Sequence, residues 1–281
     1  MEDPVKLWAP GADGLRLAAE AFGAAGDPVV LLAHGGGQSR HVWADTARLL
    51  AAAGYLAIAL DSRGHGDSDW SVPPRYEPED FARDFASVAR WRLDVDGRAP
   101  HFVGASLAGI AGLIAAGLLA PPAFATLTLV DVVPDFRTDA LDKARDLFAL
   151  GHNEGFASDD DAARALGARP GRIQVARFMR RGADGRWRWR WDPAFAERIH
   201  HDDLTRARCA GAARALSIPV HLIRAGRSEF VDRAATEAFR AMTPHLRVSD
   251  LPEARHVVTG DPDGAYARKI RDFLDSRLPP R

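Results

Sequence analysis

The chain has 281 residues, of which 47% are hydrophobic, enough to bury the core of one large domain or of a domain with a sizeable insertion. Lys and Arg together number 37 against 38 for Asp and Glu, so the formal net charge is −1 and the basic excess of a dedicated nucleic-acid binder is missing. The single cysteine, Cys209, excludes an internal disulfide and any metal site built from several cysteines.

The N-terminal stretch MEDPVKLWAP contains early acidic residues and no apolar core of the signal-peptide type. The longest nearly apolar run, residues 107–120, is shorter than the roughly 20 residues that a membrane-spanning helix needs. We therefore expect a cytoplasmic protein that binds neither membranes nor nucleic acids.

Short apolar runs rich in Val, Ile and Leu alternate with longer segments of helical period, a pattern typical of strand and helix units around a mostly parallel sheet. We expect strands at residues 15–22, 28–34, 55–61, 101–105, 125–132, 219–225 and 246–251. We expect helices at residues 40–53, 79–92, 107–119, 233–242 and 262–276. The sequence thus predicts an α/β fold in which helices flank a central sheet.

The strand at 28–34 leads into the glycine-rich stretch HGGGQSRHVW. Glycines let a backbone come close to a reacting atom and aim N–H groups at developing negative charge. The stretch lacks the Gly-Lys-Ser/Thr of a phosphate loop, and Arg40 stands where a dinucleotide-binding motif has its third glycine. We interpret it as an oxyanion loop in which His34 has a structural role.

Ser106 directly follows the strand at 101–105 and precedes the helix at 107–119, with Gly104 and Ala108 two positions to either side. A nucleophile on so sharp a turn needs small neighbours, because larger side chains would clash between strand and helix. The alternative is a serine that only caps the helix, since small residues around a serine are common.

The alternation of strands and helices breaks after Pro134 and resumes at Ile218. We therefore expect a core domain made of residues 1–134 and 218–281. The stretch between them, 135–217, is charged and helix-prone and is expected to form an inserted, mainly helical subdomain.

Within the insertion, FMRRGADGRWRWRW predicts two strands joined by a Gly-Ala-Asp-Gly turn. Strand alternation puts Trp187, Trp189 and Trp191 on one face and the arginines between them on the other. We expect Trp187 to pack inside the subdomain and the arginines to face solvent. Trp189 or Trp191 is expected to roof a substrate pocket.

His256 lies between the last expected strand and the final helix, downstream of the serine. Open parallel sheets gather their functional loops at the carboxyl ends of the strands. Gly36, Ser106 and His256 can therefore converge at one edge of the sheet.

With these pieces in place, the sequence resembles the α/β-hydrolase family over essentially the whole chain. The resemblance rests on HGGGQ in the first loop, LDSRGHGDSD after the next strand, the elbow GASLAG, and the late RAGRSEF and ARHVV, all in the family's order and spacing. The family usually has glycine where Ala108 stands. The closest likeness is to esterase-like and non-haem-peroxidase-like members with a helical cap inserted before the late acid.

The resemblance implies a role for each matching residue. Ser106 would be the nucleophile and His256 the general base and acid, while the N–H groups of Gly36 and Leu107 would be the oxyanion donors. LDSRGHGDSD would be a structural turn.

Two residues compete for the third place in the triad that the resemblance implies. Glu229 follows the penultimate strand, where the family usually places its acid, and Asp131 follows the strand before it, a position that some relatives use. Both satisfy the chain order of serine, acid and histidine. Position alone favours Glu229, with Asp131 as the alternative.

Serine on the elbow separates the chain from epoxide hydrolases and haloalkane dehalogenases, which place an aspartate there. We expect a serine hydrolase that cleaves a carboxylic ester, lactone or related acyl bond in a small molecule with an apolar portion, through an acyl-enzyme. Gly37, Trp189 and Trp191 are the expected substrate contacts, and neither a cofactor nor a metal is expected.

Two alternatives to this expectation stay open. One keeps the triad and changes the reaction, to hydrolysis of a C–C bond or to the perhydrolase chemistry of cofactor-free haloperoxidases. The other is a non-catalytic protein that binds a small molecule. The oligomeric state is also open, with a homodimer as one outcome.

Overall fold

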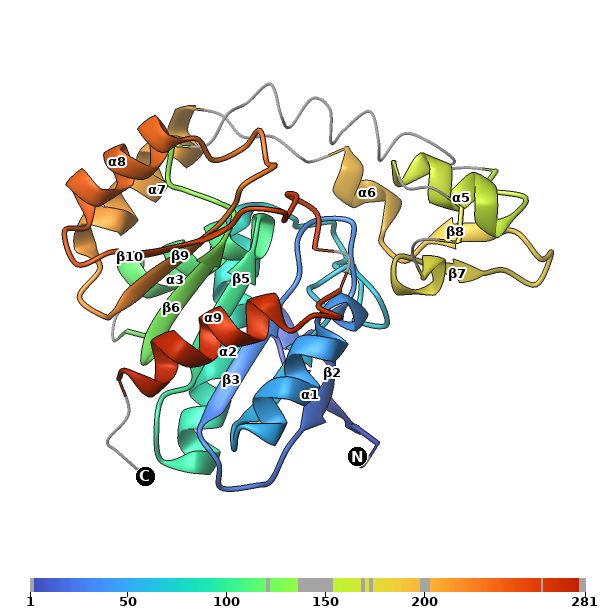
Figure 1. Ribbon diagram of the computed structural model, residues 1–281. Coiled ribbons are helices and arrows are strands. Elements are labelled where there is room, and N and C mark those ends of the chain that lie inside the picture. Colours follow the sequence, from blue (N-terminus) through green and yellow to red (C-terminus); the bar gives the residue numbers. More distant parts are fainter. Residues whose placement is uncertain are drawn as a thin grey trace.

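The computed structural model describes residues 3–119, 122–135, 154–167, 170–171, 174–197, 203–258 and 260–277. At its centre is an 8-stranded sheet with the order β1-β2-β4-β3-β5-β6-β9-β10 (Figure 1). The strands are β1 (Val5–Pro10), β2 (Arg16–Phe22), β3 (Val29–Ala33), β4 (Leu56–Leu60), β5 (His101–Ala105), β6 (Thr126–Val130), β9 (Val220–Ala225) and β10 (Arg247–Leu251). β1 pairs antiparallel with β2, as β2 does with β4, and the other pairs are parallel. This arrangement confirms the predicted α/β fold.

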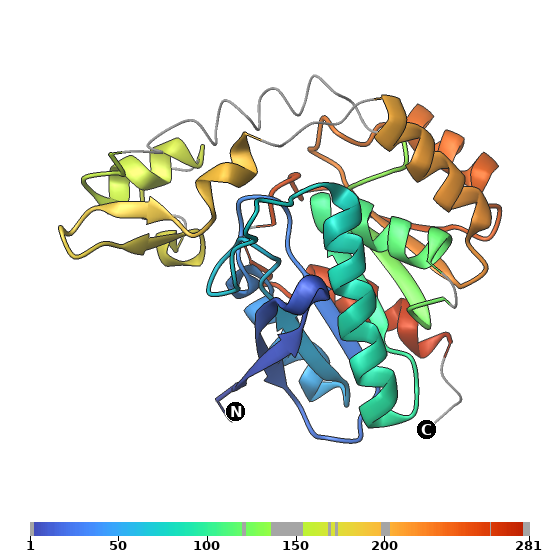
Figure 2. The ribbon, with the colours of Figure 1, turned by 180° about the vertical axis from the view of Figure 1, so that it is seen from behind.

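Helices cover both faces of the sheet (Figures 1 and 2). On one face lie α1 (Ala44–Ala52) and α9 (Ala265–Asp275), and on the other lie α2 (Pro78–Asp96) and α3 (Leu107–Leu118). α8 (Arg233–Met242) lies beside α7 (Asp203–Ala215). Because both faces are covered, β3 to β6 are buried at every position, which accounts for their apolar sequences.

The expected strands are all present, each within its predicted range, and the five expected helices are present as well. The first expected helix begins with a short 3₁₀ turn, η2 (Arg40–Trp43), before α1. α2 extends further than expected because Glu77 and Asp80 form a capping box at its start and Gly97, with φ 68°, ends it in the left-handed region. A further 3₁₀ turn, η1 (Ala12–Gly14), links the first two strands.

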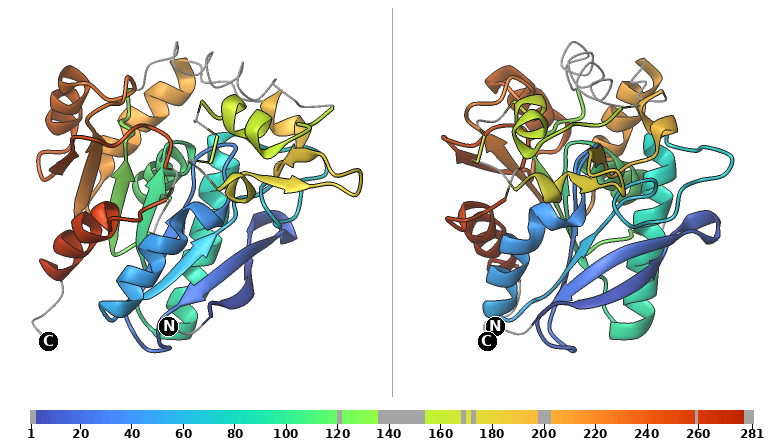
Figure 3. Two further views of the ribbon diagram at one scale, coloured as in Figure 1. Left: turned by 45° about the vertical axis from the view of Figure 1, so that its right-hand side comes forward. Right: turned by 90° about the vertical axis from the view of Figure 1, so that its right-hand side faces the viewer.

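The inserted stretch contains short elements, which are α5 (Asp159–Ala165), η3 (Val175–Arg177), β7 (Met179–Arg181), β8 (Trp187–Trp189) and α6 (Pro193–Ala196). β7 and β8 pair antiparallel, with Arg181 opposite Trp187, which confirms the predicted hairpin. These elements lie beyond the end of the sheet at which β3 and β5 finish (Figures 1 and 3). α7 follows them in the chain and packs against α3 of the core.

In the part of the chain that the structure describes, no helix has the length and hydropathy required to cross a membrane.

Candidate active site

Three polar side chains from three separate loops meet at the carboxyl edge of the sheet. Ser106 Oγ lies 3.0 Å from His256 Nε2, and His256 Nδ1 lies 2.8 Å from Asp131 Oδ2. The carboxylate accepts the Nδ1 proton, which leaves Nε2 as the acceptor for the serine hydroxyl. The three groups therefore form a hydrogen-bonded chain in which the imidazole can take the proton of the hydroxyl while the carboxylate holds the ring.

Ser106 sits on a sharp turn between β5 and α3. Its φ of 48° and ψ of −116° lie in a region that residues other than glycine rarely adopt. A Cβ placed on Gly104 would lie 2.6 Å from the carbonyl oxygen of Ala108, and one on Gly109 would lie 2.5 Å from Val132 Cγ1. The small residues around the serine are thus required by the close approach of strand and helix, and alanine is small enough at position 108.

Asp131 follows β6 and is fully buried. Its φ is 52°, and its backbone N–H donates to the carbonyl oxygen of Ile223 at 2.8 Å. The side-chain oxygen that does not contact His256 accepts the N–H of Ala225 at 3.0 Å. The adjacent strand β9 therefore holds the carboxylate in its orientation toward the imidazole.

The expectation that Glu229 is the acid partner of His256 is wrong in this geometry. Asp131 occupies the Nδ1 side of the imidazole, and Glu229 is exposed on the loop after β9. That loop turns the side chain of Phe230 toward His256, and the two rings stack with their centroids 3.6 Å apart and their planes at 10°. Phe230 is a residue of the site that the sequence analysis missed.

The glycine-rich loop lies against Ser106, since a Cβ on Gly35 would be 3.3 Å from the serine Cβ. The N–H of Gly35 donates to Gln38 Oε1 at 3.0 Å and that of Gly37 to His65 Nε2 at 3.1 Å. Among the described residues, the N–H of Gly36 between them has no acceptor. This arrangement suits Gly36 as an oxyanion donor, whereas the amide of Gly37, an expected substrate contact, is already bonded within the protein.

Leu107 is the first residue of α3, so its N–H has no acceptor inside the helix. It directly follows Ser106, and the positive end of the helix dipole lies at the same place. Within the described ranges, the N–H groups of Gly36 and Leu107 both lack an acceptor.

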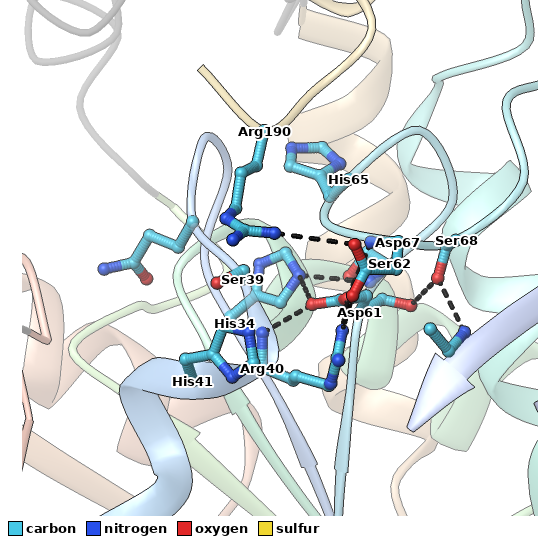
Figure 4. A network of polar contacts seen from close by, with 12 residues as sticks. His34, Ser39, Arg40, His41, Asp61, Ser62, His65, Asp67, Ser68 and Arg190 are labelled. Atoms are coloured by element: carbon cyan, nitrogen blue, oxygen red, sulfur yellow. Dashed lines mark hydrogen bonds and ion pairs between the residues drawn. The ribbon is translucent and has the colours of Figure 1, made fainter. Parts of the chain in front are cut away.

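A buried polar network joins the glycine-rich loop to the turn after β4 (Figure 4). His34 donates from Nδ1 to the carbonyl oxygen of Gly35 at 2.7 Å, and its Nε2 accepts the N–H of Ser62 at 3.0 Å. Burial lowers the pKa of His34 to about 4, so its ring is neutral at neutral pH. Arg40 at the start of η2 forms a buried ion pair with Asp61. His34 thus links two loops, in agreement with the structural role expected for it.

His65, from the DSRGHGDSD turn, likewise joins two backbone segments through its ring nitrogens. Its Nδ1 donates to the carbonyl oxygen of Arg63 at 2.9 Å, and its Nε2 accepts the N–H of Gly37. Burial lowers the pKa of His65 to about 3. Gln38 adds a bridge to the loop that contains His256, because its Nε2 donates to the carbonyl oxygen of Val258 at 2.8 Å.

The inserted segment is tied to this turn by backbone contacts. His65 and Trp191 form an antiparallel bridge, and the N–H of Asp192 donates to the carbonyl oxygen of Gly64 at 2.7 Å. Asp192 also caps α6 and accepts the hydroxyl of Tyr76. These contacts place α6 against the glycine-rich loop.

Phe195 of α6 is the residue that this tether brings to the site. A Cβ on Gly36 would lie 3.1 Å from Phe195 Cζ, and the ring packs edge-on against His65 with a centroid distance of 4.5 Å. Phe195 was not among the expected site residues. The Asp-Pro pair before it predicts the start of a helix, but this local pattern does not indicate what the helix covers.

The three tryptophans of the hairpin differ in burial. Trp189 and Trp191 are only 7% and 3% exposed and stack on each other at 5.9 Å, with Phe156 and Phe195 at the two ends of the pair. Trp187, expected inside, is only half-buried, and its Nε1 donates to Asp159 at 2.6 Å. Trp189 and Trp191 thus pack within the inserted segment, and Phe195 contacts both Trp191 and the glycine-rich loop.

The arginines of the hairpin are paired rather than simply solvated. Arg188 forms an ion pair with Asp184 at 2.7 Å, and Arg190 approaches Asp67 of the core at 3.5 Å (Figure 4). Arg190 therefore adds a charged contact between the insertion and the core. No cluster of three or more His, Cys, Asp or Glu side chains suited to a metal occurs within the described ranges.

Comparison with known proteins identifies the family to which the chain belongs. The family model described as alpha/beta hydrolase fold matches residues 28–169. Esterase Rv0045c of Mycobacterium tuberculosis is 31% identical over 262 residues, which cover 89% of this chain and 84% of the esterase. A crystal structure of that esterase superposes with a TM-score of 0.73 at 28% identity and covers 98% of this chain and 92% of its own.

Two further proteins are similar to the chain. Protein phosphatase methylesterase 1 of Homo sapiens is 30% identical over 136 residues, 48% of this chain and 35% of the methylesterase. The crystal structure of E-2-(acetamidomethylene)succinate hydrolase superposes with a TM-score of 0.80 at 24% identity, covers 97% of this chain and 99% of its own, and shows a shared fold. With a family match over half of its length and an esterase relative over most of it, the chain belongs to the α/β-hydrolase fold family, and its relatives support a hydrolytic activity.

Proposed function

We propose that the protein is a serine hydrolase that cleaves carboxylic esters or lactones of small molecules through an acyl-enzyme. The observation that carries the proposal is the path from Ser106 Oγ through the imidazole of His256 to the buried carboxylate of Asp131, with distances of 3.0 and 2.8 Å. Hydrolytic relatives and the elbow conformation of the serine support it.

Acylation begins when Ser106 Oγ attacks the carbonyl carbon while His256 Nε2 takes the hydroxyl proton. The negative charge that develops on the carbonyl oxygen is met by the N–H groups of Gly36 and Leu107, which need no reorganisation to receive it. When the intermediate collapses, the imidazolium returns its proton to the leaving alcohol, and the acyl group stays on the serine.

Deacylation repeats these steps with water in place of the serine hydroxyl. His256 takes a proton from the water, hydroxide attacks the acyl carbon, and the proton returns to Ser106 Oγ as the acid leaves. Throughout, Asp131 holds the Nδ1–H tautomer of His256 and stabilises the imidazolium in each half-reaction.

The substrate is proposed to have an apolar portion, because the rings of Phe195 and Phe230 lie beside the oxyanion loop and the imidazole. Such rings exclude water from the reacting centre and favour apolar groups through contact area. An ester of a small molecule fits these surroundings better than a highly charged substrate does.

The test is turnover of a panel containing p-nitrophenyl esters of increasing acyl length, lactones and β-diketones by the wild type and Ser106→Ala. We expect ester or lactone hydrolysis that falls by roughly 10³-fold or more in Ser106→Ala. Cleavage of diketones alone would indicate a C–C hydrolase, and turnover that needs peroxide would indicate a perhydrolase. Binding without turnover of any member would indicate a binding protein and contradict the proposal.

A further inference from the structure

The stack of Phe230 on His256 differs from the other aromatic contacts around the site. Its centroid distance of 3.6 Å and interplanar angle of 10° make it a face-to-face pair. His65 and Phe195, by contrast, meet edge to face at 71°, and so do Trp43 and Tyr266 at 87°. Two uncharged rings prefer offset or edge-on contacts to a direct sandwich. The arrangement therefore calls for a reason other than packing between neutral rings.

A charged imidazole supplies that reason. The negative face of a phenyl ring attracts a cation placed over it, and the attraction grows when the pair is shielded from water. The His256 side chain is only 16% exposed, so the stack is largely shielded. The same geometry that is poor for a neutral imidazole is favourable for an imidazolium.

We propose that Phe230 is a positioning residue of the reaction, whose ring face stabilises the imidazolium that His256 becomes when Ser106 attacks. The inference rests on the proposed serine-hydrolase function and deepens it. In the step concerned, the Oγ–H bond of Ser106 breaks, a bond from the proton to His256 Nε2 forms, and the imidazole gains a positive charge. The carboxylate of Asp131 interacts with that charge in the plane of the ring, and the ring of Phe230 interacts with it on one face.

The protein fixes Phe230 in place from both sides. Two backbone hydrogen bonds of 2.9 Å join the loop after β9 to the loop that leads to His256, from the N–H of Gly226 to Leu251 and from that of Arg227 to Ala254. A Cβ on Gly226 would lie 2.6 Å from the carbonyl oxygen of Pro252, so the two loops are in close contact.

The residues next to Phe230 are anchored as well. Its own N–H donates to Ser228 Oγ at 3.0 Å. Val231, which follows it, is buried, and Asp232 then caps α8 through the N–H of Ala235 at 2.7 Å. The ring is thus held over the imidazole before any substrate arrives, which is the condition for electrostatic stabilisation without reorganisation.

The first test compares Phe230→Leu with Phe230→Tyr, using kcat and KM for an ester that the wild type hydrolyses. Leucine keeps an apolar cover on the imidazole but has no ring face, whereas tyrosine keeps the face. We expect kcat to fall about 3-fold to 30-fold in Phe230→Leu with KM nearly unchanged, and to recover to within about twofold of wild type in Phe230→Tyr. Equal kcat values in the two variants would contradict the proposal.

A sharper test changes only the charge distribution of the ring. Replacing Phe230 by 3,4,5-trifluorophenylalanine keeps the shape of the side chain and weakens the negative face, so the proposal predicts a lower kcat with an unchanged melting temperature. The same replacement at Phe124, which stacks on Phe102 in the core, is the matched control and should leave kcat unchanged. Full activity of the variant fluorinated at 230 would overturn the proposal.

Labelling of Ser106 by a fluorophosphonate separates failure of this inference from failure of the proposed function. The probe also requires proton transfer from serine to histidine, but it does not depend on the identity of the natural substrate. If the wild type is labelled and the variant fluorinated at 230 is labelled more slowly, both proposals stand. Equal labelling rates overturn the role of Phe230 alone, and an unlabelled wild type overturns the serine-hydrolase function on which that role depends.

Discussion

Asp131 combines the features that a carboxylate needs to orient an imidazole. It is fully buried, its backbone is held by Ile223, and one side-chain oxygen accepts the N–H of Ala225 while the other faces His256. Because burying an unpaired charge is costly, the contacts of the carboxylate with Ala225 and His256 offset its burial. The residue is therefore specialised for one orientation of the histidine ring.

The acid is tested by comparing Asp131→Asn with Glu229→Gln, two changes of equal chemistry at the two candidate positions. Asparagine can donate to Nδ1 and so stabilise the wrong tautomer, and kcat should fall about 10³-fold to 10⁴-fold. Glu229→Gln should stay within about twofold of wild type, because that side chain is exposed on the loop after β9. The measurement is ester turnover, with circular dichroism to confirm that both variants fold. The opposite ranking would return the role to Glu229.

The sequence alone could place the serine and the histidine but not this acid. Ser106 and His256 follow strand ends in the family's order, and parallel strands bring such positions together whatever the loops do. Asp131 and Glu229 both follow strand ends between the serine and the histidine. Only the direction of the loop after β9 decides which of them reaches the imidazole. That direction depends on contacts with Leu251 and Ala254 from a different strand end, which no local pattern records.

Gln38 offers a second test at this scale, because its side chain joins the oxyanion loop to the loop of His256 through Gly35 and Val258. Gln38→Glu keeps the acceptor for Gly35 but replaces the donor with an oxygen that repels the carbonyl of Val258. We expect kcat to fall about 10-fold while KM changes little, since misplacement of reacting groups lowers the rate of the chemical step. Kinetics equal to wild type would show that the bridge does not align the site.

At the scale of elements, the hairpin β7–β8 and the short helix α6 act as one unit that carries Phe195. The rings of Trp189 and Trp191 pack at its centre, and the contacts of His65 and Gly64 with residues 191 and 192 fasten it to the turn after β4. The alternation of arginine and tryptophan thus builds a small hydrophobic centre for an element too short to be stable alone.

Trp189→Ala should therefore reduce stability rather than substrate selectivity. Removing a buried tryptophan costs about 3–5 kcal/mol, which urea denaturation would detect as a lower transition midpoint. The kcat/KM values for a short acetyl ester and a long acyl ester should fall by a common factor. Trp187→Phe, at the half-buried position, is the matched control and should lose only about 1 kcal/mol, the contribution of its hydrogen bond to Asp159. A loss confined to the long ester would place Trp189 in the substrate pocket.

The elements that could be predicted are those whose pattern follows from burial. β3, β4, β5 and β6 are covered on both faces and therefore have uninterrupted apolar runs. β1 was missed because it is an edge strand with a lysine, a proline and exposed alternate positions. In the insertion, the turn sequence was enough to predict the hairpin. Which tryptophan is buried depends also on the turn around His65, which pairs with Trp191 from outside the inserted segment.

At the scale of the whole molecule, four histidines within the described ranges are buried, which are His34, His65, His101 and His221. Burial lowers the pKa of His34 and His101 to about 4 and that of His65 and His221 to about 3. In the unfolded chain each would titrate near 6.5. Between about pH 6.5 and 4 the unfolded state therefore binds more protons than the folded state, and stability is full above this range and falls as the pH decreases through it.

Each such histidine contributes a slope of about 1.4 kcal/mol per pH unit to the free energy of unfolding near pH 5, and four together contribute about 5 kcal/mol per unit. We expect urea denaturation to show a steep loss of stability between pH 6.5 and 4.5. His101→Gln, at the start of β5, should reduce the slope by the contribution of about one histidine. A stability independent of pH in this range would contradict the neutral, buried state of these side chains.

The central claim is that Ser106, activated by His256 and Asp131, forms an acyl-enzyme, and trapping that intermediate tests it most directly. The wild type is mixed with an excess of a hydrolysed ester, quenched in acid within the first turnover, digested and analysed by mass spectrometry. The account predicts an added acyl mass on the peptide that contains Ser106, no adduct and no turnover above background in Ser106→Ala, and slower accumulation in Asp131→Asn but not in Glu229→Gln. Ester turnover without any acyl group on Ser106, or retained by Ser106→Ala, would contradict it.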